Sequence, residues 1–218
     1  MTRIRWTAVL VLLAAAAVPA QAAKRVYGST LRASATIARA NGADTAFWPT
    51  ALRGHGPGAP AEGQILAIRL KGTVVATGRP GAPPPLDAIH FQHLVRRGNG
   101  RMYVDQTTQG FRAPVGGRRN TITTYRPENL CVGRGDVIAF NDEGGFAPPW
   151  YDNGVPFRVF GAVRGSRTAQ FTQDSGTFNG SEFAAGRVRH NEELLMQLVL
   201  GTGRDLGVPC RNWLHGAH

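Results

Sequence analysis

Residues 142–154, with the sequence DEGGFAPPWYDNG, gather the side chains of this chain that are best suited to bind a ligand. They combine acids and an amide with an aromatic pair, and the candidate binding residues are Asp142, Glu143, Trp150, Tyr151, Asp152 and Asn153. Flat aromatic faces pack on sugar rings with little entropy to lose, and carboxylate and amide oxygens bind hydroxyl groups. The same oxygens suit Ca²⁺. The segment therefore predicts a sugar-binding loop, a calcium loop, or a plain loop in which Trp150 caps one end of the fold.

Three further titratable residues, Asp87, His90 and His93, are spaced by three. On a strand, positions 90 and 93 face opposite sides, so we do not expect them to share a metal ion. His93 alternates with Phe91 on an apolar face, which favours a buried core histidine. Residues 47–49 (FWP) form a second aromatic segment, which we interpret as a loop that packs against the core.

The sequence contains no Gly-x-Ser-x-Gly elbow, no His-Glu-x-x-His helix and no pair of acids that can be placed across a cleft. Residues 134–136 spell Arg-Gly-Asp, a three-residue adhesion motif that often matches by chance. Gly-Asp before an apolar run predicts a turn into a strand instead. These patterns favour a non-catalytic protein with no cofactor and no resident metal, unless the 142–154 loop binds calcium.

The N-terminus predicts export. Two arginines precede an uninterrupted apolar run at 7–18, and residues 20–22 (AQA) offer small side chains where a signal peptidase reads them. About 12 apolar residues are too few to span a bilayer core, which needs about 20. We therefore expect a signal peptide over 1–22, no transmembrane segment after its removal, and a single domain over 23–218. The protein is expected to be secreted, either extracellular or associated with the cell wall.

Cys131 and Cys210 are the two cysteines of the chain. An even pair in an exported protein predicts one disulfide. No His or Cys lies at ligand spacing from either residue, which disfavours a metal site. The bond would close a loop of about 80 residues, for which the chain-entropy model gives about 4.5 kcal/mol as an upper value.

The chain is strongly basic, with 25 Lys and Arg against 14 Asp and Glu and a formal charge of +11. Removal of the two arginines in the signal peptide leaves +9 (11 − 2). The arginines are scattered, and export separates the chain from the genome, so we do not expect a nucleic acid as partner. The charge instead predicts weak, salt-dependent attraction to an anionic surface polymer or to lipid headgroups.

Short apolar alternations separated by Gly, Pro and Asn predict strands joined by turns. In the first of them, residues 64–71, we expect Leu66, Ile68 and Leu70 on the buried face and the two basic residues on the opposite face. Further strands are expected at 89–95, 101–108, 121–125, 137–140, 155–163 and 192–200.

Seven to nine short strands without a long helix predict an all-β fold, a two-sheet antiparallel β-sandwich of jelly-roll-like type with one disulfide. A hydrophobic content of 42% supports a packed core, and 28 Gly with 14 Pro predict many turns. Asn99-Gly100 between two apolar runs predicts a hairpin. Residues 192–200 (EELLMQLVL) fit both a helical and a strand period, and we predict a strand because glycines at 201 and 203 end the run.

Residues 132–138 (VGRGDVI) resemble a turn-and-strand motif of secreted bacterial β-sandwiches. The likeness extends to 62–66 (EGQIL), 121–125 (TITTY) and 192–196 (EELLM), so that residues 60–200 resemble uncharacterised exported sandwich proteins of GC-rich actinobacteria. The resemblance implies the fold but no established activity, because such families carry no catalytic motif to transfer. The aromatic segment after residue 141 departs from the pattern.

These observations predict a secreted or cell-surface non-catalytic β-sandwich that binds a glycan or another extracellular surface component. The alternative is an extracellular polysaccharide-active enzyme, a hydrolase or a lyase, on a jelly-roll scaffold. A hydrolase would need two carboxylates about 5–9.5 Å apart. A lyase would need a base such as His or Tyr beside an arginine that neutralises charge.

Overall fold

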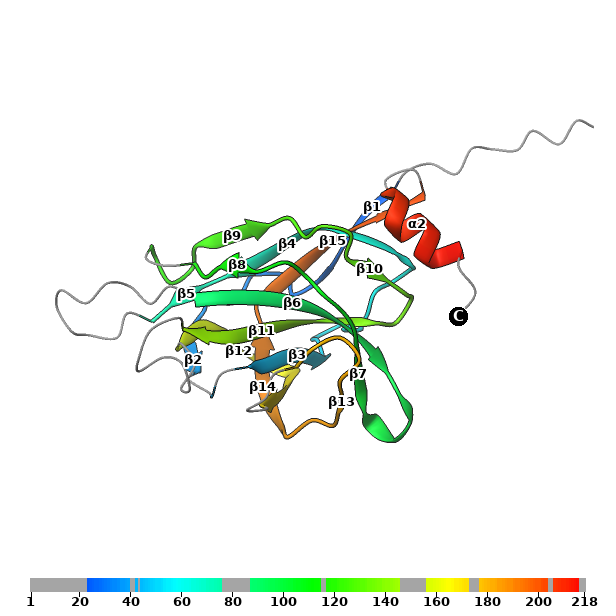
Figure 1. Cartoon of the computed structure of the whole chain (residues 1–218). Helices are drawn as coiled ribbons and strands as arrows, with labels where there is room; N and C mark the ends of the chain where they lie inside the picture. Colours follow the sequence, from blue (N-terminus) through cyan, green and yellow to red (C-terminus); the bar gives the residue numbers. More distant parts are fainter. Residues whose placement is uncertain are drawn as a thin grey trace, which may run out of the picture.

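Two antiparallel sheets and one short helix make up the described part of the chain (Figure 1). The computed structural model describes residues 23–39, 42, 44–75, 87–114, 117–145, 156–172, 177–203 and 206–215. The small sheet has the order β1 (Ala23–Gly28), β15 (Met196–Thr202), β4 (Gly63–Lys71) and β10 (Cys131–Val132), and β9 (Ile122–Tyr125) also pairs with β4.

The large sheet has seven strands in line and three short ones that pair beside them. In spatial order the seven are β13 (Glu182–Phe183), β7 (Met102–Thr107), β6 (Asp87–Arg96), β11 (Val137–Gly145), β3 (Thr45–Ala51), β12 (Phe157–Thr172) and β14 (Arg187–Leu194). The short strands β2 (Ile37–Arg39) and β5 (Thr73–Val74) pair with β12, and β8 (Phe111–Arg112) pairs with β6. The helix α2 (Val208–His215) follows the last strand, and a 3-10 turn, η1 (Gly98–Gly100), joins β6 to β7.

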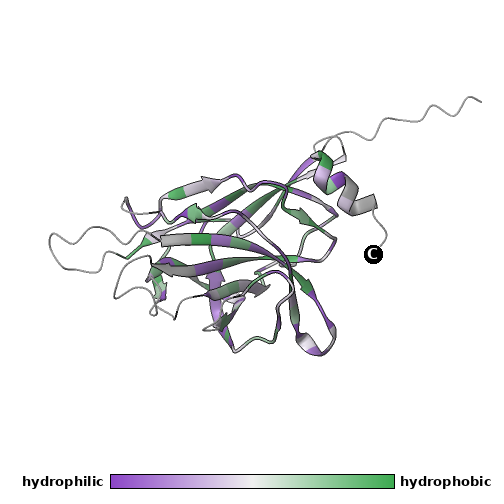
Figure 2. Ribbon diagram, viewed as in Figure 1, coloured by the Kyte–Doolittle hydropathy of each residue, from purple (hydrophilic) through white to green (hydrophobic). Residues whose placement is uncertain are grey.

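The main core lies between the two sheets. The small sheet contributes Ile65, Ile68 and Leu70 of β4, and the large sheet contributes a set of fully buried phenylalanines, among them Phe91 and Phe140. Because the two inner faces supply one continuous apolar cluster, the predicted all-β sandwich is confirmed. Hydrophobic and hydrophilic residues alternate along many of these strands, as Figure 2 shows.

A second core belongs to the large sheet alone. Trp48 of β3 lies 5.7 Å from Phe183 of β13, measured between ring centroids. Four strand spacings separate these strands, about 19 Å in a flat sheet at 4.8 Å per spacing. The large sheet must therefore curl, so that one of its faces closes around its own side chains.

Several predicted strands are confirmed with their faces. Met102 and Val104 of β7 are buried, and the hairpin between β6 and β7 turns at Asn99 and Gly100, with φ of 60° and 73°. Positive φ at two successive residues is what the Asn-Gly pair supplies in such turns. The prediction that residues 47–49 form a loop is wrong, because they lie within β3. Trp48 does pack in the core, as expected.

The predicted face of β4 is partly wrong. Ile65, Ile68 and Leu70 reach the core, and Leu66 does not. The pairing with β15 shifts register here: Val199 lies opposite Ala67 but Leu200 lies opposite Ile65, so one extra residue enters β4. Such a bulge reverses the alternation beyond it. Lys71, predicted on the solvent face, is buried, and its ammonium group donates to the carbonyl oxygen of Leu31 over 2.8 Å.

The prediction of a single strand over 192–200 is wrong. The run contains the end of β14 and the beginning of β15, which lie in different sheets. The chain passes from β14 to β15 at Leu195, which is fully buried. The amide of Leu195 donates to the carbonyl of Val159, and its own carbonyl accepts from the amide of Lys71, each over 2.9 Å. The apolar run therefore supplies core residues on both sides of a crossing, which explains why its period was ambiguous.

Candidate functional site

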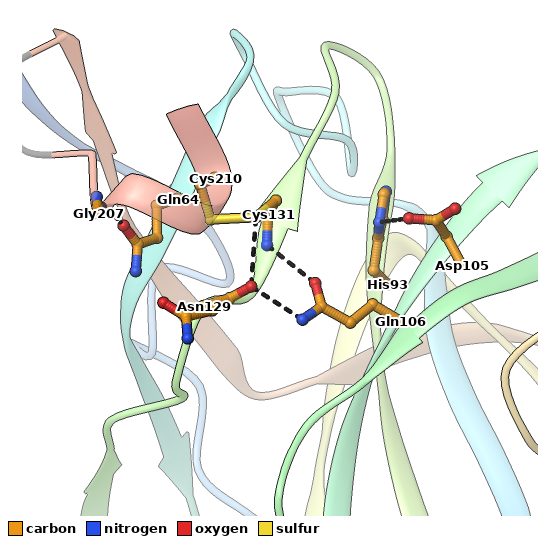
Figure 3. The surroundings of a disulfide bond; sticks show 8 residues. All are labelled: Gln64, His93, Asp105, Gln106, Asn129, Cys131, Gly207 and Cys210. Atoms are coloured by element: carbon orange, nitrogen blue, oxygen red, sulfur yellow. Dashed lines mark hydrogen bonds and ion pairs between the residues drawn. A yellow bond between two sulfur atoms is a disulfide. The ribbon is translucent and has the colours of Figure 1, made fainter. Parts of the chain in front are cut away.

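The predicted disulfide is confirmed: Cys131 of β10 is bonded to Cys210 of α2, with their Cα atoms 5.2 Å apart (Figure 3). Next to it, the amide of Gly207 donates to the side-chain oxygen of Gln64 over 2.6 Å. The helix α2, which the sequence analysis did not anticipate, is thereby held to the margin of the small sheet. The bond is structural, since both cysteines are buried.

The predicted binding loop lies almost entirely outside the described residues. This applies to Trp150, Tyr151, Asp152 and Asn153, and also to the side chain of Glu143. Asp142 is described, and it lies in β11, where its backbone pairs with β3 and β6 and its side chain is 2% exposed. The sugar, calcium and cap interpretations of residues 142–154 therefore remain predictions.

A polar pocket of about 350 Å³ is lined in part by Asn141, the residue that immediately precedes Asp142. Its lining carries amide, hydroxyl, imidazole and carboxylate groups together with one aromatic ring, from Asp44, His90, Gln92, Thr107, Asn141, Thr177, Phe178 and Asn179. Phe178 is 63% exposed, an unusual position for a phenylalanine. One of its lining residues, Asn141, directly precedes the predicted loop.

A buried hydrogen-bond network fixes the wall of the polar pocket. The amide nitrogen of Gln92 donates to the carbonyl oxygen of Thr177 over 2.7 Å and contacts its hydroxyl at 2.9 Å. The amide nitrogen of Asn141 lies 3.0 Å from the same hydroxyl. All three residues are buried, and β6 and β11 hold two of them on adjacent strands. The hydroxyl of Thr107 is also buried, and it has no hydrogen-bond partner in the described part of the chain. The pocket is thus pre-formed and polar.

His93 is a buried core histidine, as predicted, but it lies between two carboxylates that the sequence did not reveal. Its Nε2 is 2.8 Å from Asp136, and its Nδ1 is 3.2 Å from Asp105 at an ion-pair distance without hydrogen-bond alignment. Burial alone would lower the pKa of His93, but the hydrogen bond to Asp136 and the negative charges of Asp136 and Asp105 raise it above its usual value. Trp213 of α2 packs edge-on against the ring.

The arrangement at His93 can hold a charge but cannot perform catalysis on a large substrate. The ring has no exposed surface, so a polymer cannot reach either nitrogen. Asp136 also accepts a hydrogen bond from the amide of Gly133 over 2.7 Å, which closes the turn at residues 133–136. The Arg-Gly-Asp sequence is therefore a turn leading into β11, as predicted, and His93 anchors that turn to β6.

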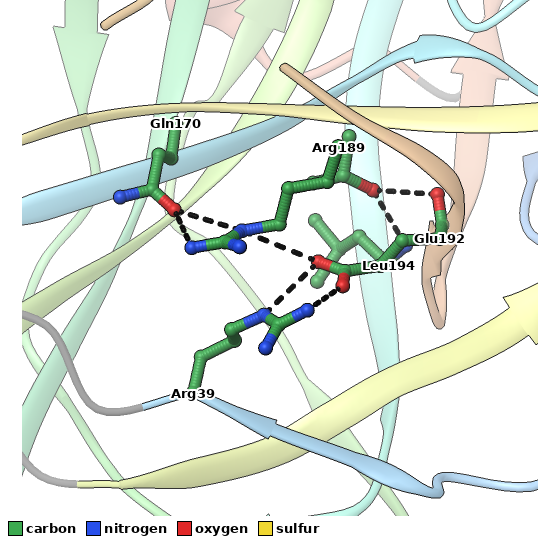
Figure 4. A network of polar contacts seen from close by, with 6 residues as sticks. Arg39, Gln170, Arg189, Glu192 and Leu194 are labelled. Atoms are coloured by element: carbon green, nitrogen blue, oxygen red, sulfur yellow. Dashed lines mark hydrogen bonds and ion pairs between the residues drawn. The ribbon is translucent and has the colours of Figure 1, made fainter. Parts of the chain in front are cut away.

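A second polar cluster joins strands of the large sheet (Figure 4). The buried carboxylate of Glu192 pairs with Arg39 of β2, and Arg189 lies 3.9 Å from its Oε1. Arg189 in turn donates to the side-chain oxygen of Gln170 over 2.8 and 3.0 Å. These side chains satisfy one another, which fits a structural role in joining β2, β12 and β14 better than a ligand site.

Within the described ranges, no three His, Cys, Asp or Glu side chains are placed to hold a metal ion. Nor does the described part of the chain include a helix with the length and apolarity needed to cross a membrane. No protein-family model, curated protein or solved structure matches the chain. The class of protein therefore rests on the structure alone, which is an all-β sandwich with one disulfide and a pre-formed polar pocket.

Proposed function

We propose that this chain is an exported, non-catalytic β-sandwich that binds an extracellular glycan, and that the polar pocket contacts the sugar. The observation that carries the proposal is the exposed ring of Phe178 beside the fixed network of Gln92, Asn141 and Thr177. The predicted signal peptide and the disulfide support the extracellular setting.

Sugar recognition has two requirements that the pocket meets. An exposed aromatic face covers the apolar side of a pyranose ring, and planar amides donate to and accept from adjacent hydroxyl groups. Phe178 supplies the first, and the exposed amide of Asn179 supplies the second. Because buried hydrogen bonds already order the pocket wall, binding would cost little additional side-chain entropy. The predicted loop at 142–154 begins next to Asn141 and would extend the same site with Trp150 and Tyr151.

The small number of carboxylates among the described lining residues favours binding over hydrolysis. Among the described residues of its lining, Asp44 is the single carboxylate, whereas a glycosidase needs two across the scissile bond. The buried acid–histidine–acid cluster at His93 is out of reach of a polymer. The alternative of a hydrolase or lyase on this scaffold gains no specific support from the described side chains.

A glycan array followed by calorimetric titration of the mature chain tests the proposal. We expect a neutral or weakly charged oligosaccharide to bind, and Phe178→Ala and Asn179→Ala each to weaken it about tenfold, which corresponds to about 1.4 kcal/mol. Val208→Ala is the matched control, because Val208 is also apolar and 63% exposed but lies on α2. Equal binding by the Phe178 variant and the wild type would refute the assignment of the pocket.

The predicted loop is tested separately with Trp150→Ala. If the loop belongs to the glycan site, this change should abolish binding and leave stability within about 0.5 kcal/mol of the wild type. If Trp150 instead caps the sandwich, the same change should cost about 3–5 kcal/mol, because it removes a buried aromatic ring. Thermal melts of the purified variant distinguish the two outcomes. Calorimetric titration with CaCl₂, with and without EDTA, tests the calcium interpretation.

A further inference from the structure

Three arginines from separate parts of the sequence line one groove of about 660 Å³. Arg32 follows β1, Arg53 lies in the turn after β3, and Arg164 lies within the long strand β12. His55 lines the same groove, and its Nε2 donates to the carbonyl oxygen of Gly28 over 2.8 Å. Positive groups that are far apart in sequence are thus gathered in one hollow of the surface.

Among the described residues, no polar contact of these three guanidinium groups ties one part of the fold to another. Each arginine is exposed, and within the described residues none of the three side chains makes a hydrogen bond or an ion pair. Arg39 and Arg189, in contrast, are paired with Glu192 or Gln170. Arginines that are gathered but unpaired repel one another, which costs stability unless an anion is bound between them.

The carboxylate in this groove, that of Glu193, already accepts hydrogen bonds from other groups of the protein. Glu193 is 5% exposed, and its two carboxylate oxygens accept hydrogen bonds from the hydroxyls of Ser29 and Ser166 over 2.7 and 2.6 Å. It is the single acid among the described lining residues, so the positive charges there outnumber the negative by three to one. The serines hold the carboxylate at the floor and leave the arginines free for a ligand.

The groove continues into a second hollow of about 610 Å³, which shares Thr30, Arg32 and His55 with the first. No acid is among the described residues that line this second part. Its lining includes Tyr27, Gly28 and Pro60, which offer apolar and backbone surface. An elongated path that is basic at one end and mildly apolar at the other suits a linear chain rather than a compact ion.

We propose that this arginine groove binds an acidic polysaccharide, with Arg32, Arg53 and Arg164 contacting the carboxylate or sulfate groups along the polymer. Guanidinium groups form bidentate, charge-assisted hydrogen bonds with such planar or tetrahedral oxyanions. The arginines line a hollow rather than project from a flat face, which favours a strand of polymer over a lipid surface. This site is formed by residues other than those of the polar pocket and does not depend on the function proposed for it.

The experiment measures binding of the mature protein to two defined polymers, an oligogalacturonate for carboxylate and a dextran sulfate fragment for sulfate, with uncharged dextran as the negative control. We expect binding to at least one acidic polymer in 50 mM NaCl and none to dextran. The double variant Arg53→Gln/Arg164→Gln should weaken binding about tenfold or more. Raising NaCl to 500 mM should weaken it to a similar degree, because the contacts are ionic.

Matched controls separate a built site from general positive charge. Arg134→Gln removes one exposed arginine from the turn at residues 133–136, outside the groove, and should change affinity less than about twofold. An equal loss of affinity with Arg134→Gln and with the single variant Arg53→Gln would overturn the proposal, as would an absence of binding to both acidic polymers at low salt. Tighter binding to anionic lipid vesicles or to DNA, through the same arginines, would overturn the polysaccharide assignment. Phe178→Ala should leave acidic-polymer binding unchanged, so failure of the polar pocket and failure of the groove can be told apart.

Discussion

Loss of the Cys131–Cys210 bond should destabilise the protein by an amount that the length of the closed loop determines. The two cysteines are 79 residues apart in sequence, and the segment between them contains every strand from β11 to β15. For a loop of about 80 residues, the chain-entropy relation gives about 15 cal/mol/K, or about 4.5 kcal/mol at 25 °C. In the double variant Cys131→Ala/Cys210→Ala this entropy returns to the unfolded chain.

The contacts of α2 that remain without the disulfide set the lower limit of the loss in stability. In the double variant, α2 would be held to the sandwich mainly by the hydrogen bond from Gly207 to Gln64 and the packing of Trp213 on His93. Detachment of so short a helix leaves both sheets paired. The denatured chain also retains some structure, which reduces the entropic gain. We therefore expect a loss of about 2–4.5 kcal/mol in the free energy of unfolding.

Urea unfolding and thermal melts of the double variant provide the assay. For a domain of this size, 1 kcal/mol shifts Tm by about 2–4 °C, so Tm should fall by about 4–18 °C. Dithiothreitol should produce the same shift in the wild type and none in the double variant. A loss below about 1 kcal/mol would refute the reasoning, because it would mean that the loop is already constrained in the unfolded state.

The remaining predictions concern single residues. Because the pKa of His93 is raised on folding, its contribution to stability is full below the unfolded pKa of about 6.5 and is lost as pH rises through the higher folded pKa. His93→Gln should therefore flatten the decline in urea-unfolding free energy above about pH 6.5, and an unchanged decline would contradict the assignment. Trp48→Ala should cost about 3–5 kcal/mol in the same assay, because the ring is 2% exposed; a cost below about 1 kcal/mol would mean that the second core is not formed in solution. Gly72→Ala should be more destabilising than Gly54→Ala: both have positive φ, but a Cβ at residue 72 would lie 2.0 Å from a carbonyl oxygen of β12, whereas one at residue 54 meets open space. Equal melting temperatures for the two variants would contradict this close approach.

The strands were largely predictable from the sequence because their signal is local. The alternation around Met102 and Val104 and the Asn-Gly turn before it depend on neighbouring residues alone. The bulge in β4 was not predictable, because it arises from how β15 pairs with Ile65 and Ala67. The crossing at Leu195 was missed for a related reason. A run that is apolar on both sides gives no sign of the point at which it changes sheets.

The candidate functional positions were less predictable than the fold, because they depend on contacts between distant segments. Asp136 was recognisable as part of a turn, but its partner His93 lies 43 residues earlier and was brought to it by the pairing of β6 with β11. Arg53 and Arg164 appear in the sequence as two of many scattered arginines. Charge composition predicted an anionic partner in general. The strand order determines where the positive charges of the chain gather.

The order of strands in the small sheet also limits when the protein can finish folding. β1 pairs with β15, so that Val26 lies opposite Val199, 173 residues later (199 − 26). β15 also lies along one edge of β4. A chain that emerges with its N-terminus first, from a ribosome or from a translocation channel, must keep β1 and that edge of β4 unpaired until β15 appears. Pairing across so long a separation is slow, and open strand edges invite aggregation in the interval. Yield on expression should therefore depend on how well the unfinished chain is kept apart from its copies, even though the completed fold is secured by a disulfide.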